Sequence, residues 1–411
     1  ETGWRQWVRL TDIALVLPQG DISGDATLAL SGALAGARPN LTASLTSKRL
    51  DLDALRAAFA SPKPAAPARK TAPSAPPPPP LHVNIVPPPA RLIPDTPIPL
   101  ALLNAADANL TLGIGSLTEG GVTYGNVSGK LALQDGHLTL DPFGVQVPGG
   151  HLALTASVNA SASPPPVALS LDAPALALKP LLAAFGLPAE ASGTLQLQAH
   201  LSGAGDTPHA IAAGLNGSLG MAMAGGSVDN RVVTTLLGSV LRVAHVPPGL
   251  LGSGQSPVRC FAARLDSTAG NATLRTLLLE TGRLTLMGSG GLALGPESLA
   301  LHLQPSYQYG GGAISLPVIV GGTFLAPKIE PDVAGEIGTP DKARGTLAEI
   351  LGALRGQPEN SVPACEPALA LARFGAPGPA APAAAPPPSG GNGKSTAPNN
   401  PLNLLRGLFH Q

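Results

Sequence analysis

LTSKRLDLDALRAAF at residues 45–59 and LDAPALALKPLLAAF at residues 171–185 share one spacing of leucines, alanines and a closing phenylalanine. Each stretch continues a proline-led strand pattern, at residues 39–45 and 165–171, and each ends in a run typical of a short helix. Repeats of this size predict stacked units, each of which covers part of its neighbour's apolar face. The sequence therefore indicates an elongated scaffold before it indicates an active site.

The strand signal is an alternation of apolar residues with small or polar ones. Ser-Gly pairs followed by alternating leucines recur at Ser23, Ser128 and Ser192. Alternation of this kind gives each strand one apolar and one polar face. Asp135-Gly136, between two leucines, is typical of a two-residue hairpin turn, and short turns join antiparallel strands. We therefore predict an antiparallel meander with one leucine-coated face.

Composition narrows this prediction. The chain has 411 residues, of which 44% are hydrophobic but only 3% are aromatic and 12% charged. A globular core of that size normally contains more bulky aromatic residues, so a broad sheet fits better. Nucleic-acid binding requires a stripe or patch of basic residues. The 25 basic and 25 acidic residues of this chain form no such stripe. Nucleic acid is therefore not an expected partner.

Cysteine and histidine give few signs of chemistry. Cys260 and Cys365 form no CxxC pair, and they are either two independent buried thiols or one disulfide of an oxidising compartment. Four of the eight histidines, at positions 137, 151, 200 and 302, stand beside leucines on predicted strands, where the polar face would carry them. No nucleophile, phosphate-loop or metal-ligand motif occurs in the context that it needs. We expect no enzyme activity, no metal and no cofactor.

The sequence predicts few helices and no membrane-spanning segment. The runs 228–243, 341–354 and 402–409 favour short helices. The most apolar stretch, Val228 to Leu251, is interrupted by arginines and prolines, so no segment of the chain is expected to span a membrane. Since the chain begins at Glu1 in a strand pattern, we expect a processed or truncated product whose membrane anchor lies outside it.

PVIVGGTFLAPKIEPD at residues 317–332 resembles the closing motif of the AsmA family: an apolar strand, a Gly-Thr turn, then Pro-Lys-hydrophobic-x-Pro-Asp. LTSKRLDLDAL at 45–55, DGHLTLDPF at 135–143 and VRCFAA at 258–263 resemble the same family in the same order. The resemblance covers most of residues 20–335 and departs from the family pattern at the long proline-rich insertion.

Composition, periodicity and the resemblance together predict a chain of six parts. Expected are the end of an upstream AsmA-like β-repeat region (1–60), a Pro/Ala-rich linker (61–99), an AsmA-like C-terminal β-domain (100–335), a helical extension (336–375), a disordered Ala/Pro/Gly/Ser linker (376–400) and a short amphipathic helix (401–411). The implied fold is mainly β: an elongated, curved antiparallel sheet of repeated units that forms an apolar groove, with few short helices and proline-rich disordered insertions.

The resemblance also implies a site. The leucines expected to line the groove are Leu131, Leu133, Leu152, Leu154, Leu195, Leu197, Leu299, Leu301 and Leu303. Gly322, Thr323, Pro327 and Lys328 are expected to shape its end. A leucine face of this breadth has to be covered, and acyl chains would do so at about 25 cal/mol per Å². An ordinary sandwich core is the other interpretation of these leucines.

Two functions of different classes follow. The first is a non-enzymatic envelope protein of Gram-negative bacteria, anchored in the inner membrane upstream, whose periplasmic groove carries phospholipid toward the outer membrane and supports outer-membrane assembly. The alternative is a periplasmic scaffold that binds outer-membrane or periplasmic proteins and regulates their targeting or assembly without carrying lipid. A third interpretation, a hydrolase on a β-scaffold, requires that strand histidines converge with Asp or Glu.

Overall fold

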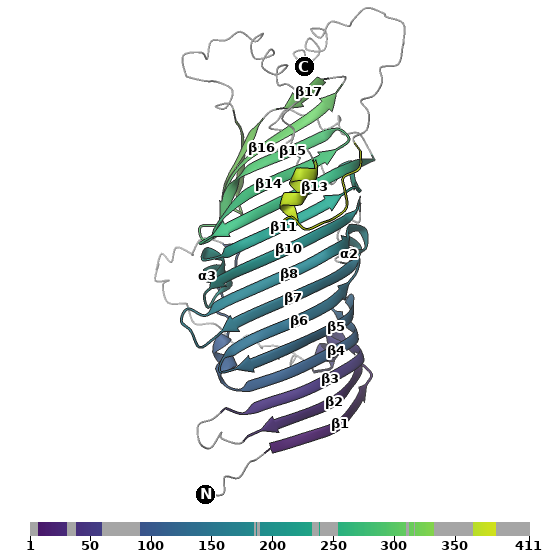
Figure 1. Ribbon diagram of the computed structural model, residues 1–411, viewed down its shortest axis with the longest axis vertical. Coiled ribbons are helices and arrows are strands. Elements are labelled where there is room, and N and C mark those ends of the chain that lie inside the picture. The colour runs from purple at the N-terminus through teal and green to yellow at the C-terminus, as the bar shows by residue number, and fades with distance from the viewer. Residues whose placement is uncertain are drawn as a thin grey trace, which may run out of the picture.

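The computed structural model describes residues 7–30, 38–59, 91–184, 186, 190–231, 238, 254–309, 312–315, 317–332 and 365–383. Strands dominate these residues and lie one above another as rungs along the long axis (Figure 1). The predicted helices 341–354 and 402–409 lie outside the described residues, as does most of 228–243. The first two residues of that last prediction belong instead to a short strand, Ser227–Asp229.

The elements are as follows. The strands are β1 (Trp7–Leu17), β2 (Gly20–Ala29), β3 (Asn40–Asp51), β4 (Asp107–Glu119), β5 (Val122–Gln134), β6 (His137–Val147), β7 (Gly150–Asn159), β8 (Pro166–Ala177), β9 (Ala191–Ser192), β10 (Thr194–Ala204), β11 (Asn216–Ala224), β12 (Ser227–Asp229), β13 (Gln255–Thr268), β14 (Asn271–Thr281), β15 (Leu284–Ala293), β16 (Ser298–Tyr309), β17 (Gly312–Ser315), β18 (Val318–Gly322) and β19 (Pro327–Pro331). The helices are α1 (Leu52–Phe59), η2 (Leu100–Asn104), α2 (Leu178–Ala184), α3 (Pro208–Ala213) and α6 (Cys365–Ala372).

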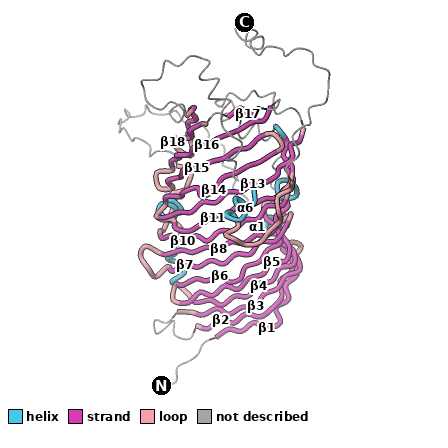
Figure 2. Tube along the Cα trace, turned by 45° about the horizontal axis from the view of Figure 1, so that its top comes forward, coloured by secondary structure: helices cyan, strands magenta, loops and turns pink. Residues whose placement is uncertain are grey.

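Strands adjacent in sequence are, with few exceptions, adjacent in the sheet. The ladder runs from β1 through β8 to β10, β11, β13 to β16, β18 and β19, while β9 and β12 pair beside the start of β13. The tube view shows this stack of strands bending across its width (Figure 2). The predicted mainly β, elongated and curved sheet is confirmed, and the strands β1–β3 and β4–β19 belong to one sheet.

One pair departs from the predicted antiparallel meander. β3 and β4 are parallel, in register from Asn40 opposite Asp107 to Asp51 opposite Thr118. A parallel pair needs a connection long enough to return to the same end of the sheet. The proline-rich insertion and α1 provide that length between residues 51 and 107. The prediction of antiparallel pairing was wrong for this pair because it did not consider that a long insertion lets the chain return to the same end of the sheet.

The two repeated stretches fold alike. Residues 40–59 form β3 followed by α1, and residues 166–184 form β8 followed by α2. The Asp51 carboxylate accepts a hydrogen bond from the Ala54 amide (2.8 Å), which caps the first turn of α1. The predicted hairpin is also confirmed, since Asp135 and Gly136 join β5 to β6 with φ angles of 52° and 77°.

The strand ends form two rims. Because most neighbours are antiparallel, successive connections alternate between a rim that carries α2 (right in Figure 1) and a rim that carries α3 (left in Figure 1). We call these the α2 rim and the α3 rim. The α2 rim includes the β1–β2, β4–β5, β6–β7 and β14–β15 turns. The α3 rim includes the β5–β6, β7–β8, β10–β11 and β15–β16 connections.

Residues 91–105, here called the edge strap, run along the α3 rim. The amides of Leu92 and Ile93 donate to the Glu297 carboxylate at the β15–β16 turn (2.7 and 3.0 Å). Ile98 N–H donates to Asp206 O (2.7 Å), and Asn104 Nδ2 donates to Ala160 O (3.2 Å) in the β7–β8 turn. The C-terminal part of the predicted 61–99 linker is therefore an ordered brace.

The C-terminal segment packs on the sheet. Ala368, Leu369 and Ala372 of α6 are buried against Ala222 and other residues of β11, β13 and β14. Residues beyond α6 stay attached to the same face, since Ala381 N–H donates to Glu366 (2.7 Å) and Arg259 donates to Pro382 O (2.9 Å). The predicted disordered linker from residue 376 is thus ordered as far as residue 383. The prolines of this segment cannot continue the helix, but their carbonyl oxygens accept hydrogen bonds from arginines: Pro379 from Arg373 and Pro382 from Arg259.

Candidate functional site: an apolar sheet face

Cross-strand register places the leucines predicted for the groove on one face. Leu131 lies opposite Leu110 on β4 and Leu140 on β6. Leu133 lies opposite Ala108 and Leu138 on the same two strands. Residues directly opposite one another project from the same side of a sheet. These pairs therefore begin a shared apolar face, here called the apolar face.

The middle strands continue the apolar face. Leu154 pairs with Phe143 and Leu171, and Leu152 pairs with Val145. On β10, Leu195 lies opposite Leu176 and Met223, and Leu197 lies opposite Ala173 and Met221. A continuous series of cross-strand partners links β6 to β16. Its members, one per strand, are Leu140, Ala156, Leu169, Leu201, Gly217, Ser267, Ala272, Leu292 and Leu299.

The C-terminal strands carry the last three predicted leucines. Leu301 lies opposite Gly290 and Val320, and Leu303 lies opposite Gly288 and Val318. The apolar face therefore extends unbroken from β3 to β18. At about 4.8 Å between neighbouring strands, the thirteen strands of the ladder from β3 to β18 give a length of roughly 60 Å.

The N-terminal part of this face is hollowed. A hollow of ≈ 260 Å³ lies over β3 to β6, and its lining consists of Ala43, Leu45, Leu110, Thr111, Leu112, Gly129, Leu131, Leu140 and Phe143. Leu112 is 37% exposed, and Leu131, Leu133, Leu152 and Leu154 are half-buried. A surface of this composition can hold apolar chains, and Thr111 is the one polar side chain in the lining of the hollow.

The C-terminal part of the face is packed. Leu284, Leu286, Leu303, Tyr307, Val318 and Val320 form one buried cluster, with Val228 and Ile329 packed against it. Leu303 is buried, and Leu299 and Leu301 lie half-buried beside it. The predicted groove residues thus share one face but not one environment.

The strand histidines lie on the opposite, polar face. His137, His151, His200 and His302 alternate with residues of the apolar face, and all four are exposed. His200 Nδ1 lies 3.2 Å from Ser170 Oγ, and His302 Nδ1 lies 3.4 Å from Asp332. Within the described ranges these histidines do not gather into a group that could offer three metal ligands.

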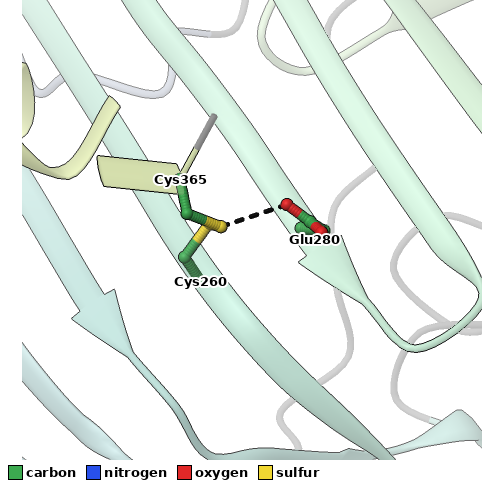
Figure 3. A group of neighbouring side chains, drawn as sticks. All are labelled: Cys260, Glu280 and Cys365. Atoms are coloured by element: carbon green, nitrogen blue, oxygen red, sulfur yellow. Dashed lines mark hydrogen bonds between the residues drawn. A yellow bond between two sulfur atoms is a disulfide. The ribbon is translucent and has the colours of Figure 1, made fainter. Parts of the chain in front are cut away.

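A disulfide joins the sheet to the C-terminal segment. Cys260 on β13 and Cys365 at the start of α6 are bonded, with their Cα atoms 5.9 Å apart (Figure 3). Glu280 Oε2 lies 3.1 Å from Cys365 Sγ, and Arg259 Nη1 donates to Glu280 Oε1 (2.7 Å). In the described part of the chain these three residues are the one group with metal-ligand spacing, but the disulfide engages both sulfur atoms.

The predicted end motif forms the turn between β18 and β19. Gly322 has a φ of 86°, and a Cβ there would lie 2.6 Å from Ala326 O, so glycine fits this position. Ala326 N–H donates to Thr323 Oγ1 (3.2 Å). Pro327 pairs with Gly322, and the exposed Lys328 pairs with Gly321. These residues close one end of the sheet at the α3 rim.

Sequence reasoning missed three carboxylates that hold the strand ends. Asp21 accepts from the Lys48 and Arg49 amides, and these hydrogen bonds lower its pKa. The Gly121 and Gly120 amides lower the pKa of Asp53 in the same way. Burial raises the pKa of Glu297, but the amides of the edge strap outweigh burial and the net shift is downward. Acidic residues without a motif give no sequence signal for such contacts.

Taken together, these features define an elongated open-sheet protein with one continuous apolar face. The model of the AsmA family matches residues 8–277, and the chain belongs to that family. It is 27% identical over 232 residues to the AsmA family protein YhjG of Escherichia coli (strain K12). That match covers 56% of this chain and 32% of the relative, so the chain spans about a third of the relative's length. No solved structure matches the chain.

Family membership fits a role in biogenesis of the bacterial envelope. Across the described ranges, the helices are too short or too polar to cross a bilayer.

Proposed function

We propose that this protein carries phospholipid along its apolar face, on the periplasmic side of the Gram-negative inner membrane, and thereby supports assembly of the outer membrane. The role is non-enzymatic: the protein supplies an apolar path, and water is excluded from acyl chains that lie on it. Upstream anchoring in the inner membrane and contacts with outer-membrane or periplasmic proteins belong to the same proposal.

The observation that carries the proposal is the continuity of the apolar face together with its open N-terminal part. Leu112 is exposed beside a hollow lined almost wholly by aliphatic and aromatic side chains. Exposed apolar surface costs about 25 cal/mol per Å² in water, and acyl chains recover that free energy when they cover it.

The test is mass spectrometry of lipids that copurify with the detergent-free protein. We expect phospholipid with the wild type and its loss in Leu154→Asp and Leu197→Asp, because a carboxylate on the apolar face cannot be covered by acyl chains without a desolvation cost. Thr155→Asp is the matched control, since Thr155 neighbours Leu154 in sequence but lies on the polar face and is exposed.

The outcomes separate the two candidate functions. Phospholipid that is present in the wild type and in Thr155→Asp, but absent from the apolar-face variants, supports carriage. A folded wild type that never carries lipid contradicts the proposal and favours the protein-binding scaffold. Retention of lipid in folded Leu154→Asp and Leu197→Asp would mean that lipid binds elsewhere.

A further inference from the structure

The two rims of the sheet are built differently. On the α3 rim, the edge strap lies across the strand ends from the β15–β16 turn to the β7–β8 turn. Thr207 Oγ1 donates to Asp95 Oδ1 of the strap (2.9 Å), and His209 N–H donates to Pro94 O (3.1 Å). Backbone and side chains therefore cover the α3 rim between the β7–β8 and β15–β16 turns.

Charges on the α3 rim are largely paired with each other. Arg38 lies 3.2 Å from Asp135 and 3.9 Å from Asp107, and Arg91 lies 2.9 Å from Asp95. Glu297 is buried under the edge strap. Lys328, in β19 at the far end of the rim, is an exposed cation. Apart from that end, the α3 rim offers few positive charges to a ligand.

The α2 rim carries exposed cations along its length. Lys48 lies near the end of β3, Lys179 in α2 and Arg283 in the β14–β15 turn, and all three are exposed. Within the described ranges, no ion pair involves any of these three side chains. Other cations of this rim are paired, Arg56 with Glu119 and Arg231 with Asp229. The Asp21 and Asp53 carboxylates accept backbone amides, and the Lys48 charge is a lesser cause of the lowered pKa of Asp21. The α2 rim thus presents cations to solvent.

The difference in charge between the two rims matters for a bound phospholipid, which has apolar chains and an anionic phosphate. Acyl chains on the apolar face leave the phosphate at the boundary with water, because burying an ionised group on an apolar surface is unfavourable. Free ammonium and guanidinium groups attract phosphate through charge-assisted hydrogen bonds. A covered rim with paired charges offers neither space nor counter-charge.

We infer that the α2 rim is the headgroup rim, where Lys48, Lys179 and Arg283 hold the phosphates of glycerophospholipids whose acyl chains lie on the apolar face. This inference rests on the proposed lipid carriage and adds an orientation to it. All lipids on the apolar face then point their headgroups to one side, and they move past successive cations as they travel from strand to strand along the long axis.

Photo-crosslinking tests the orientation in the full chain. Phosphatidylglycerol with a photoreactive headgroup is loaded from vesicles, and the crosslinked peptides are identified by mass spectrometry. We expect labels near the β3 end, α2 and the β14–β15 turn. Labels in the edge strap, the Asp135–Gly136 turn or α3 would overturn the inference. A second phosphatidylglycerol with its photoreactive group in the acyl chain should label the apolar face, and its failure to do so would contradict lipid carriage itself.

Charge variants give an independent measurement. The triple variant Lys48→Gln, Lys179→Gln, Arg283→Gln should take roughly three- to tenfold less phosphatidylglycerol from mixed phosphatidylethanolamine and phosphatidylglycerol vesicles, since each exposed ion pair contributes modestly. The control Lys130→Gln, Arg91→Gln, Lys328→Gln removes the same charge from the polar face and the α3 rim. Equal losses in the two variants would mean that net charge, and not the α2 rim, governs capture.

Discussion

The apolar face is made of the same alternating apolar residues over β3–β8 and over β14–β18, yet the two stretches are packed to different extents. The first combines a small buried cluster of Ile114, Val127 and Val145 with an open part, and the second contains a larger buried cluster. Over β3–β6 there is a hollow of ≈ 260 Å³ with Leu112 37% exposed. Over β14–β18, Leu284, Tyr307 and Val318 are at most 1% exposed. A period of two assigns a residue to a face of the sheet, but it does not determine what covers that face.

The second stretch is supported on both sides. On the apolar face Val228 contacts the buried cluster, and on the polar face α6 covers β11, β13 and β14. Arg264 stacks on Phe374 beyond α6, with its guanidinium carbon 4.4 Å from the ring centroid. The sheet thus combines a rigid packed stretch with an open one, and substitutions can separate their roles.

The largest expected effect comes from one substitution made in each stretch. Leu303→Asp places a carboxylate in the buried cluster and should destabilise the protein by at least about 4 kcal/mol. Leu131→Asp sits beside the hollow, where the carboxylate reaches water, and should cost less than about 1 kcal/mol. Midpoints of urea denaturation followed by circular dichroism measure both. Similar losses in the two variants would show that the first stretch is as covered as the second.

The disulfide should matter next, and only in α6 and the strands beneath it, β13 and β14, not in the open stretch. Cys260→Ala with Cys365→Ala opens a loop of 105 residues and should cost about 2 to 5 kcal/mol. Using both substitutions avoids leaving a reactive free thiol. Hydrogen exchange should rise in α6, β13 and β14, and the amides of β3–β8 should keep their wild-type protection. A uniform rise across both stretches would contradict the idea that they respond separately.

Acid should have a smaller effect that reaches both stretches. Burial raises the pKa of Asp266, but hydrogen bonds from Arg264 and Arg275 outweigh it and lower that pKa, as the strand-end amides lower those of Asp21 and Asp53. A carboxylate with a depressed native pKa stabilises the fold above its ordinary pKa of about 4, and this stability is lost as pH falls through the native value.

Thermal melting against pH measures that effect. Asp53→Asn for the open stretch and Asp266→Asn on β13, beside the packed stretch, should each lower the melting temperature at neutral pH and converge with the wild type in acid. A constant offset at all pH values would show that the carboxylate charge is not what stabilises these contacts.

Local patterns predicted much of this fold. The repeat predicted strand followed by helix at β3–α1 and β8–α2, alternation predicted one shared face for the nine leucines, and Asp135-Gly136 predicted its hairpin. Each of these depends on neighbours within a few residues. The Gly-Thr turn after β18 was expected from the resemblance to the AsmA closing motif.

Long-range features were not predictable from one sequence. The parallel pairing of β3 with β4, the attachment of Leu92 to Glu297 and the docking of α6 on β13 all join residues separated by tens to hundreds of positions. The cysteines show why: their spacing was compatible with two free thiols or with one bond, because pairing depends on Cα separation in the folded chain. The open and packed stretches differ for the same reason.

The disulfide also decides how the molecule transmits mechanical force. A pull applied between the β1 end and the segment after α6 passes from β13 through the Cys260–Cys365 bond directly into α6. Residues 261–364 form a side loop that bears none of this tension. The strands β14 to β19 are therefore shielded from stretching along the long axis, and the load falls on the ladders between β1 and β13, which include the open stretch of the apolar face.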